Sequence, residues 1–306
     1  MAQRTKVAIV GAGAMGTLYA YALASRNDVT LVDVRADVVE SIAERGVAVG
    51  DEAARRVEVT RDPARVFATQ FLFLFVRAPD TLGAVRPFAG QMNPATPIVS
   101  LQNGLGNEEA IKTGLGGTVP LVLGVTTEAS LSVGHGRATR LASGTTLLGS
   151  GGASLATLQS VAGLLEDAGM RASLTYDIRP HLWGKLLVNA AINPVAALLD
   201  RTNGAVVSDA DAADLARNLL AEGVAVARAL GVALPFEDPW NFVCASLAST
   251  ASARNSMTID LEAHRPSEID QINGALVATG RRHGIPTPYN DAVVRLVRAK
   301  QRGGTD

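Results

Sequence analysis

The sequence predicts an α/β protein in which a doubly wound, mostly parallel sheet comes first and an all-α domain follows. Up to residue 176, short runs rich in β-branched residues alternate with helix-like segments, which is typical of a parallel sheet. From residue 177 onward strand patterns vanish, and long segments rich in Ala and Leu dominate. A chain of 306 residues is also long enough for two domains. We therefore expect domains at residues 1–176 and 177–306.

The first strand and helix flank a glycine-rich turn. A β-branched run at 6–10 precedes the turn, and a helix-like segment at 17–25 follows it. Gly11 permits a tight turn, Gly13 lets the backbone approach a pyrophosphate, and Gly16 lets the helix lie close to the strand. The phosphates would lie at the helix N-terminus, where N–H groups and the helix dipole favour negative charge. The expected cofactor-binding turn, typical of a Rossmann-type dinucleotide-binding domain, comprises Gly11, Ala12, Gly13, Ala14, Met15 and Gly16.

The second strand, at 29–32, ends at Asp33, about where an acid meets the adenine-side ribose of such a cofactor. A carboxylate accepts hydrogen bonds from both ribose hydroxyls and repels a 2′-phosphate, so Asp33 favours NAD(H) over NADP(H). Arg35 keeps NADP(H) open, because its guanidinium could pair with that phosphate. For Asp33 alone, the alternative is a turn or cap residue before the next helix.

Further strands are expected at 71–76, 98–101 and 119–125. Ligands of a parallel sheet bind beyond the carboxyl ends of its strands, which is where Arg77 and Asn103 lie. Arg77 is either a ribose or phosphate contact or an exposed residue at a strand end. Asn103 belongs to the stretch QNGLG and is either an amide near the nicotinamide or part of an Asn-Gly turn.

The rest of the chain continues the two patterns. Gly-rich alternation at 126–152 predicts antiparallel strands that complete the sheet, and a helix at 155–168 and a last strand at 172–176 follow it. The all-α half is expected to hold helices at roughly 178–200, 209–230, 238–250 and 267–283.

The helix at 178–200 carries a polar stripe. Lys185, Asn189 and Asn193 are four residues apart, so they stack on one face of an otherwise apolar helix. Because an unpaired buried ammonium or amide is costly, this stripe should face an enclosed polar site such as a substrate pocket; a solvated surface helix is the alternative. Pro194 lacks a backbone donor and should free or bend away the carbonyl of Ala190.

Composition favours small-molecule chemistry. Lys and Arg number 28 against 29 Asp and Glu, so no basic field favours nucleic acid or an anionic membrane. A single cysteine, Cys244, excludes an intrachain disulfide framework and a cysteine-rich metal site, which fits a reducing compartment. We see neither a secretion signal nor a membrane span, so we expect a cytoplasmic protein with no nucleic-acid partner and no metal.

Five motifs together resemble the ketopantoate reductase (2-dehydropantoate 2-reductase) family. They are GAGAMG at 11–16, QNGLG at 102–106, LWGKLLVNAAINP at 182–194, NSM at 255–257 and SEIDQING at 267–274. The likeness runs from about residue 6 to 298. It implies a Rossmann domain followed by a helical domain of the 6-phosphogluconate dehydrogenase type, a nicotinamide-dependent 2-oxo acid reductase, and a homodimer.

The resemblance also implies roles for individual residues. Lys185 matches the general acid, and Glu268 matches its assisting carboxylate. A lysine suits that role because an ammonium stabilises negative charge on a ketone oxygen and can give it a proton. Taken alone, Glu268 fits an acid in the first turn of a helix that begins at Ser267, where the dipole favours it without any function. The positions that match substrate-binding residues are Asn103, Asn189, Asn193 and Ser256.

The chain departs from the family's pattern at three positions. Ala253 replaces a usual asparagine and Ile259 a usual glutamine, so the expected pocket loses an amide and becomes drier. Asp33 is the third departure, because its carboxylate favours NAD(H) whereas familiar members of the family favour NADP(H). Two activities stay open: reduction of ketopantoate, and an NAD-dependent D-2-hydroxyacid dehydrogenase acting on a mandelate-like or branched acid. A dinucleotide-binding sensor without turnover is the alternative from another class.

Overall fold

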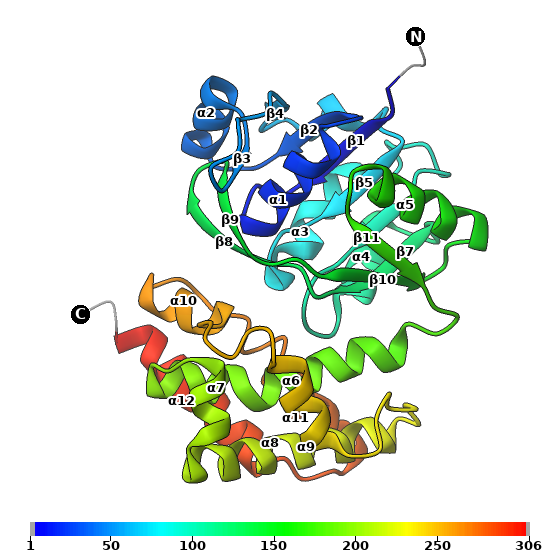
Figure 1. Ribbon diagram of the computed structural model, residues 1–306. Helices are drawn as coiled ribbons and strands as arrows, with labels where there is room; N and C mark the ends of the chain where they lie inside the picture. The colour runs from blue at the N-terminus through cyan, green and yellow to red at the C-terminus, as the bar shows by residue number, and fades with distance from the viewer. Residues whose placement is uncertain (1–3, 304–306) are drawn as a thin grey trace. The chain divides into compact units, whose positions relative to one another are not determined.

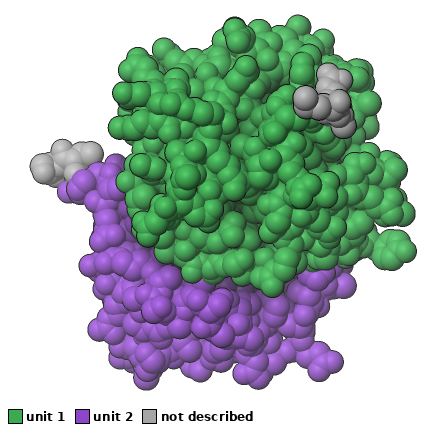
Figure 2. Space-filling view, turned by 45° about the horizontal axis from the view of Figure 1, so that its top comes forward, with its two compact units in different colours: residues 1–102, 107–178 green, residues 103–106, 179–306 purple. Residues whose placement is uncertain are grey.

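The computed structural model describes residues 4–303, which fall into two compact units. The sheet unit takes in the chain up to Gln102 and Asn107–Ile178, and the helical unit takes in Asn103–Gly106 and the chain from Arg179 onward (Figure 2). The four residues Asn103–Gly106 thus belong with the helices, which the sequence patterns did not predict.

An eight-stranded sheet forms the sheet unit, with strand order β11-β10-β7-β6-β5-β1-β2-β4 (Figure 1). Neighbouring strands are parallel except β7 and β10. The order runs outward from β1 in both directions, so the predicted doubly wound sheet is confirmed and its switch point lies between β1 and β5. The strands are β1 (Lys6–Val10), β2 (Asp28–Val32), β4 (Glu58–Thr60), β5 (Phe71–Leu74), β6 (Ile98–Ser100), β7 (Leu121–Thr126), β10 (Thr145–Ser150) and β11 (Arg171–Leu174).

A second, three-stranded sheet corrects part of the prediction for 126–152. β10 does join the main sheet, but β8 (Ala129–Gly134) pairs with β9 (Arg137–Ala142), and β9 pairs with β3 (Ala48–Val49). The reason is that β10 already occupies the edge of β7, the strand that directly precedes the hairpin in the chain. It packs against α1 (Ala14–Leu23), opposite the main sheet.

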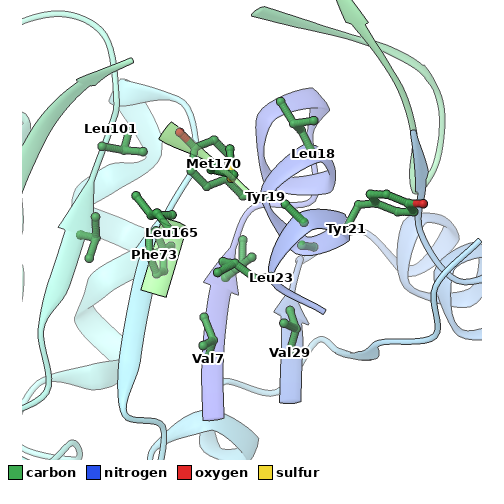
Figure 3. Packing of buried hydrophobic residues seen from close by; sticks show 14 of the residues in the cluster. Val7, Leu18, Tyr19, Tyr21, Leu23, Val29, Phe73, Leu101, Leu165 and Met170 are labelled. Carbon is green, nitrogen blue, oxygen red and sulfur yellow. The ribbon is translucent and has the colours of Figure 1, made fainter. Parts of the chain in front are cut away.

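Helix α1 is the anchor of the sheet unit's core. Eight of its ten residues are buried, because it is covered both by the main sheet and by the β8–β9 hairpin. Leu23 of α1 lies close to Val7 and Val29 of the sheet (Figure 3), and Leu18 and Phe73 belong to the same buried cluster. This packing fixes the start of α1, and with it the glycine turn. The other helices of this unit are α2 (Ala36–Arg45), α3 (Thr81–Val85), α4 (Asn107–Leu115) and α5 (Leu155–Asp167), with short 3-10 turns at Pro63–Val66, Ala78–Asp80 and Arg86–Phe88.

Seven helices and no strand make up the described part of the helical unit. They are α6 (Arg179–Leu199), α7 (Asn203–Ser208), α8 (Ala210–Ala229), α9 (Pro239–Leu247), α10 (Ser256–Glu262), α11 (Asn273–His283) and α12 (Pro288–Gly303). The α6 helix is central, and α7, α8, α10 and α12 pack against it. The segment predicted as one helix at 209–230 is preceded by a separate short one, because Asp209 breaks the helical backbone and caps α8 through the N–H of Ala212. Neither α10 nor α12 was predicted.

The helix expected at 267–283 begins only at Asn273, so the expectation that Glu268 occupies its first turn is wrong. Residues 268–272 form turns, and the backbone of Ile272 (φ −100°, ψ −90°) is not helical. The Ser267 hydroxyl accepts from the N–H of Ile269, and Asp270 binds Arg298 of α12 at 2.7 Å.

The α6 helix is long and apolar enough to cross a membrane by composition alone. However, 72% of its most apolar window is buried inside the structure, as in the core helix of a soluble protein. Its apolar character is therefore explained by its central position among the helices.

Candidate active site

The glycine turn after β1 has the geometry that a dinucleotide's phosphates require. Gly11 has φ +101°, and a Cβ there would lie 2.8 Å from the backbone of Phe75 and Val76. A Cβ on Gly16 would lie 1.8 Å from the carbonyl oxygen of Gly11. Gly13 is exposed, and a Cβ on it would meet nothing within 4 Å. Two glycines are thus required by the fold itself, whereas the third leaves open space beside the turn.

The helix that follows presents an uncapped N-terminus. Gly13 is the N-cap residue of α1, no side chain caps the helix, and its first turn holds no acid. Ala14 and Met15 are partly exposed, and Ala12 is buried. Backbone N–H groups and the helix dipole therefore face the open space beside Gly13, which fits the diphosphate of a nicotinamide dinucleotide.

Asp33 lies directly after β2, and its carboxylate is held from three directions. The N–H of Ala12 donates to Oδ2 at 2.9 Å, and Arg35 donates through its backbone N–H and, in a bidentate pair, through Nε and Nη2 at 3.0 and 3.1 Å. Burial alone would raise the pKa of Asp33, but the Arg35 and backbone hydrogen bonds outweigh it and hold the pKa below its usual value. The carboxylate is therefore ionised at neutral pH, and Arg35 is its partner.

Arg77 follows β5 by three residues and precedes the 3-10 turn at Ala78–Asp80. It is half-buried at the carboxyl end of the sheet, next to the switch point. In the same region Gln102, after β6, donates to the carbonyl of Val76 at 2.8 Å and to the hydroxyl of Thr81 at 2.7 Å. Gln102 thereby ties the chain ends after β5 and β6 together and fixes where Arg77 emerges.

The polar stripe of α6 forms as predicted, and its lysine is perturbed. Lys185 and Asn189 are half-buried and Asn193 is buried, on a helix whose other residues are largely apolar and buried. Burial lowers the pKa of the Lys185 ammonium to about 8, and the negative charge of Glu268 opposes that shift. Sequence could not decide between these two effects; in the structure burial is the larger. An amine with such a pKa holds a proton at neutral pH and gives it up readily.

Glu268 lies in a turn that also contacts the segment Asn103–Gly106. The N–H of Gln271 bonds to the carbonyl of Glu268 at 3.1 Å, and the N–H of Leu105 bonds to the carbonyl of Gln271 at 3.1 Å. Gly104 (φ +86°) passes so close to this turn that a Cβ there would lie 2.8 Å from the Gln271 carbonyl oxygen. The helical unit therefore includes Asn103 together with the Glu268 turn.

Gln271 was not singled out from the sequence. Its Oε1 is buried and has no hydrogen-bond partner among the described residues. Such an atom in a site is a natural acceptor for a ligand's donor group. It lies in the SEIDQING motif at 267–274, from which only Glu268 was assigned a role.

Ser256 lies elsewhere on the helical unit, as the exposed first residue of α10. Asn255 caps this helix through the N–H of Thr258 at 3.0 Å and donates to Asn203 of α7 at 3.0 Å. Because α10 packs against α6, Ser256 belongs to the same helical assembly as Lys185. The departures from the family pattern, Ala253 and Ile259, flank Ser256 and are both partly exposed.

The freed carbonyl predicted from Pro194 is present. Ala190 accepts a hydrogen bond of 2.9 Å from the side-chain amide of Asn273, on α11. Asn273 was also missed at the level of sequence, since proline predicts the acceptor but not the donor.

The helical unit therefore holds an amine, a carboxylate and amides, and the sheet unit, described by itself, holds an uncapped helix N-terminus at a glycine turn. No group of three or more His, Cys, Asp or Glu suited to a metal ion occurs among residues 4–303. The groups present fit proton transfer and anion stabilisation beside a nicotinamide cofactor.

Comparison with known proteins gives consistent matches over most of the chain. A family model described as Ketopantoate reductase PanE/ApbA matches residues 7–152, and one described as its C-terminal region matches residues 177–301. A 2-dehydropantoate 2-reductase from Streptococcus pyogenes is 32% identical, over 96% of this chain and 97% of the relative.

Solved structures of this fold include two informative neighbours. A PanE/ApbA family ketopantoate reductase from Ralstonia eutropha JMP134 has a TM-score of 0.90 and 28% identity, covering 99% of this chain and 100% of its own. A D-mandelate dehydrogenase with NADH and anilino(oxo)acetate has a TM-score of 0.88 and 25% identity, covering 98% and 99%.

Proposed function

Because this chain belongs to the ketopantoate reductase family and is an NAD(P)-dependent oxidoreductase, we propose that it interconverts a branched 2-oxo acid and its D-2-hydroxy acid. Ketopantoate is the leading substrate. The observation that carries the proposal is the Lys185 amine, whose pKa burial lowers to about 8 while Glu268 acts on it. A chain that keeps such an amine beside a carboxylate is suited to turnover, which argues against a sensor.

In the reductive direction Lys185 is the general acid. A nicotinamide cofactor, when bound, supplies the hydride. As negative charge develops on the ketone oxygen of the substrate, the Lys185 ammonium stabilises it and passes a proton to that oxygen. Glu268 keeps a larger fraction of the amine protonated, because its negative charge raises the pKa of Lys185.

The amides and a hydroxyl orient the substrate in this proposal. Asn189 and Asn193 continue the stripe of Lys185 along α6 and bind a substrate hydroxyl. Ser256 holds the substrate carboxylate. Asn103 belongs to the segment that contacts the Glu268 turn, and in this proposal it contacts both the substrate and the nicotinamide.

For the cofactor we propose NAD(H) in preference to NADP(H). Gly11, Ala12, Gly13, Ala14, Met15 and Gly16 would hold the diphosphate, and Arg77 would contact ribose or phosphate. Asp33 supports NAD(H) because its carboxylate is ionised and nearly buried, with 8% of its surface exposed. Arg35 neutralises that carboxylate through a bidentate pair, so it is not available to a 2′-phosphate unless the pair opens.

A second activity is favoured by the fold neighbour that binds NADH. The D-mandelate dehydrogenase structure contains NADH and anilino(oxo)acetate, an oxoacetate that carries a phenylamino group. Ala253 and Ile259 make the wall near Ser256 less polar, which suits an aromatic or β-branched acid. We therefore keep an NAD-dependent D-2-hydroxyacid dehydrogenase as the alternative.

The test is a turnover screen with both reduced cofactors. We expect kcat/KM for ketopantoate to exceed the values for benzoylformate and 2-oxoisovalerate. If ketopantoate is the poorest substrate of the three, the assignment as a ketopantoate reductase fails and the D-2-hydroxyacid dehydrogenase takes its place. Lys185→Ala should lower kcat by several orders of magnitude with little change in cofactor Kd. The matched control is Lys112→Ala, since Lys112 is paired with Glu108 on the surface of α4. Equal turnover of Lys185→Ala and the wild type would refute the mechanism.

The cellular location, the partners and the oligomeric state of the enzyme follow from the same assignment. We propose a cytoplasmic protein that acts on a small molecule without nucleic acid or membrane, and a homodimer as its assembly. Light scattering of the purified protein distinguishes the dimer from a monomer of 31.7 kDa.

A further inference from the structure

Pro194 leaves one carbonyl of α6 without its helical donor, and Asn273 supplies the missing hydrogen bond. In a regular helix the carbonyl of residue 190 accepts from the N–H of residue 194, which proline lacks. The side-chain amide of Asn273 donates to the Ala190 oxygen at 2.9 Å. Asn273 is fully buried, with 0% of its surface exposed, so water cannot take its place.

A buried network holds the Asn273 side chain in one orientation. Both N–H groups of the Asn290 side chain are used, by Glu222 at 2.7 Å and by the carbonyl of Leu219 at 3.1 Å. The Asn290 oxygen must then face Asn273, which donates to it at 2.9 Å. Glu222 is itself fixed by the backbone N–H groups of Tyr289 and Asn290 at the start of α12. Asn273 is therefore required to present its NH₂ group to Ala190.

The side-chain oxygen of Asn273 indicates which of its polar groups matters at this position. Its Oδ1 is buried and has no hydrogen-bond partner in the described part of the chain. Leaving an acceptor unpaired in an apolar core is unfavourable, and Asn273 is surrounded by such a core, with Ala190, Leu276 and Ile272 among its members. The donors of Asn273, and not its acceptor, therefore explain an asparagine at this position.

This hydrogen bond joins the two segments that carry the proposed acid and its carboxylate. Ala190 lies five residues after Lys185 on α6, and Asn273 lies five residues after Glu268. The backbone between Glu268 and Asn273 is a compact series of turns, closed by the N–H groups of Gln271 and Ile272 on the Glu268 carbonyl. A shift of α11 against α6 would therefore be passed on to the Glu268 side chain.

The Glu268 carboxylate is the charge that acts on the Lys185 amine. On helices packed against α6, three charged side chains have partners elsewhere: Glu222 bonds to the start of α12, Asp260 pairs with Arg265, and Lys300 donates to the Ala197 carbonyl. The same helices also carry Asp211, Asp214, Arg217 and Arg228 on α8, Glu262 on α10, and Asp291, Arg295, Arg298 and Arg302 on α12.

Resting on the proposed function, we propose that Asn273 is a positioning residue: its hydrogen bond to the carbonyl that Pro194 frees sets the separation between the Lys185 amine and the Glu268 carboxylate. Pro194 and Asn273 act together. Proline creates an acceptor on the catalytic helix, and asparagine uses that acceptor to fix the neighbouring segment.

The test compares Asn273→Leu, Pro194→Ala and the double variant. Asn273→Leu removes the donor, so we expect kcat to fall about ten- to a hundredfold with little change in KM, as expected of small misplacements. The basic limb of the pH profile should move to lower pH, because Glu268 then raises the pKa of Lys185 less. Thr279→Val, a buried polar residue of the same helix, is the matched control and should leave the pH profile unchanged.

The double variant separates positioning from stability. Pro194→Ala restores an N–H to α6, so the Ala190 carbonyl regains a helical donor when Asn273 is replaced. We expect the double variant to recover much of the thermal stability lost in Asn273→Leu, but neither kcat nor the pH profile. If kcat and the pH profile recover together with stability, Asn273 merely satisfies a carbonyl and the proposal is overturned. If Asn273→Leu does not fold, the double variant carries the same comparison.

A readout without substrate distinguishes failure of this inference from failure of the proposed function. The rate at which acetic anhydride acetylates Lys185, followed by peptide mass spectrometry over pH, reports the pKa of its amine directly. A lower pKa in the double variant than in Pro194→Ala supports the positioning role even if no 2-oxo acid is turned over. An unchanged pKa refutes it even if the enzyme is active.

Discussion

Replacing the proposed catalytic lysine should make the protein more stable at neutral pH. Burial lowers the pKa of Lys185 from 10.5 to about 8, which means that the folded protein disfavours the protonated amine. The fall corresponds to about 3 kcal/mol of folding free energy at pH 7. Lys185→Met keeps the length of the side chain and removes the charge, so we expect it to raise the unfolding free energy by up to about 3 kcal/mol while abolishing turnover.

The pH dependence of this effect has a defined sign. Below pH 8 the amine is protonated in both states, and the folded state carries the full unfavourable contribution. Between pH 8 and 10.5 the unfolded chain binds more protons than the folded one, so the stability of the wild type rises with pH. The advantage of Lys185→Met should therefore shrink, to less than about 1 kcal/mol by pH 10.

Urea unfolding followed by tryptophan fluorescence measures this advantage. Both tryptophans of the chain, Trp183 and Trp240, lie in the helical unit, so the signal reports the unit that contains Lys185. The experiment compares midpoints and m-values at pH 7, 8.5 and 10 for the wild type and Lys185→Met.

Two controls make the result decisive. Lys112→Met removes a lysine that is 42% exposed and should change stability by less than about 0.5 kcal/mol at every pH. Combining Lys185→Met with Glu268→Gln removes any cost of leaving the carboxylate without its counter-charge. A wild type whose stability relative to these variants is the same at pH 7 and pH 10 would refute the burial argument.

Three further outcomes follow from the site. Asp33→Ser, with Arg35 kept, should shift the kcat/KM ratio towards NADPH, because the guanidinium loses its carboxylate partner; an unchanged ratio would contradict the cofactor assignment. Glu268→Gln should move the basic limb of the kcat profile for reduction from about pH 8 to lower pH, since the carboxylate raises the pKa of Lys185. Gly13→Ala should keep its melting temperature, as its Cβ meets nothing within 4 Å, but weaken cofactor binding by about tenfold or more in fluorescence titrations; unchanged affinity would argue against diphosphate binding there.

Local patterns predicted much of the sheet unit. The run at 6–10, the glycine turn and the acid after the second strand were each recognisable within a few residues, and the structure contains β1, α1 and β2 in those places. The partners of later strands were harder to predict. The hairpin β8–β9 pairs with β3, more than 80 residues away in the chain, because β10 had taken the adjacent edge.

The polar stripe of α6 and the freed carbonyl at Ala190 were also predictable, since a helix repeats every 3.6 residues and proline lacks an N–H. The turn that holds Glu268 was not predictable, because the pattern of a serine followed by an acid occurs both at the start of a helix and before a series of turns. The structure decides that case: residues 268–272 form turns, closed by the N–H groups of Gln271 and Ile272 on the Glu268 carbonyl.

By itself the sequence determined which residue types lie along each strand and helix, because periodicity, turns and caps depend on neighbours a few positions apart. The tertiary structure alone decided how strongly Lys185 is buried and which side chain donates the hydrogen bond that the Ala190 carbonyl of α6 lacks. Both depend on contacts between distant segments, such as Asn273 with Ala190, 83 residues apart. Burial and long-range hydrogen bonds set the energy of a charge or a carbonyl, and no local pattern encodes either.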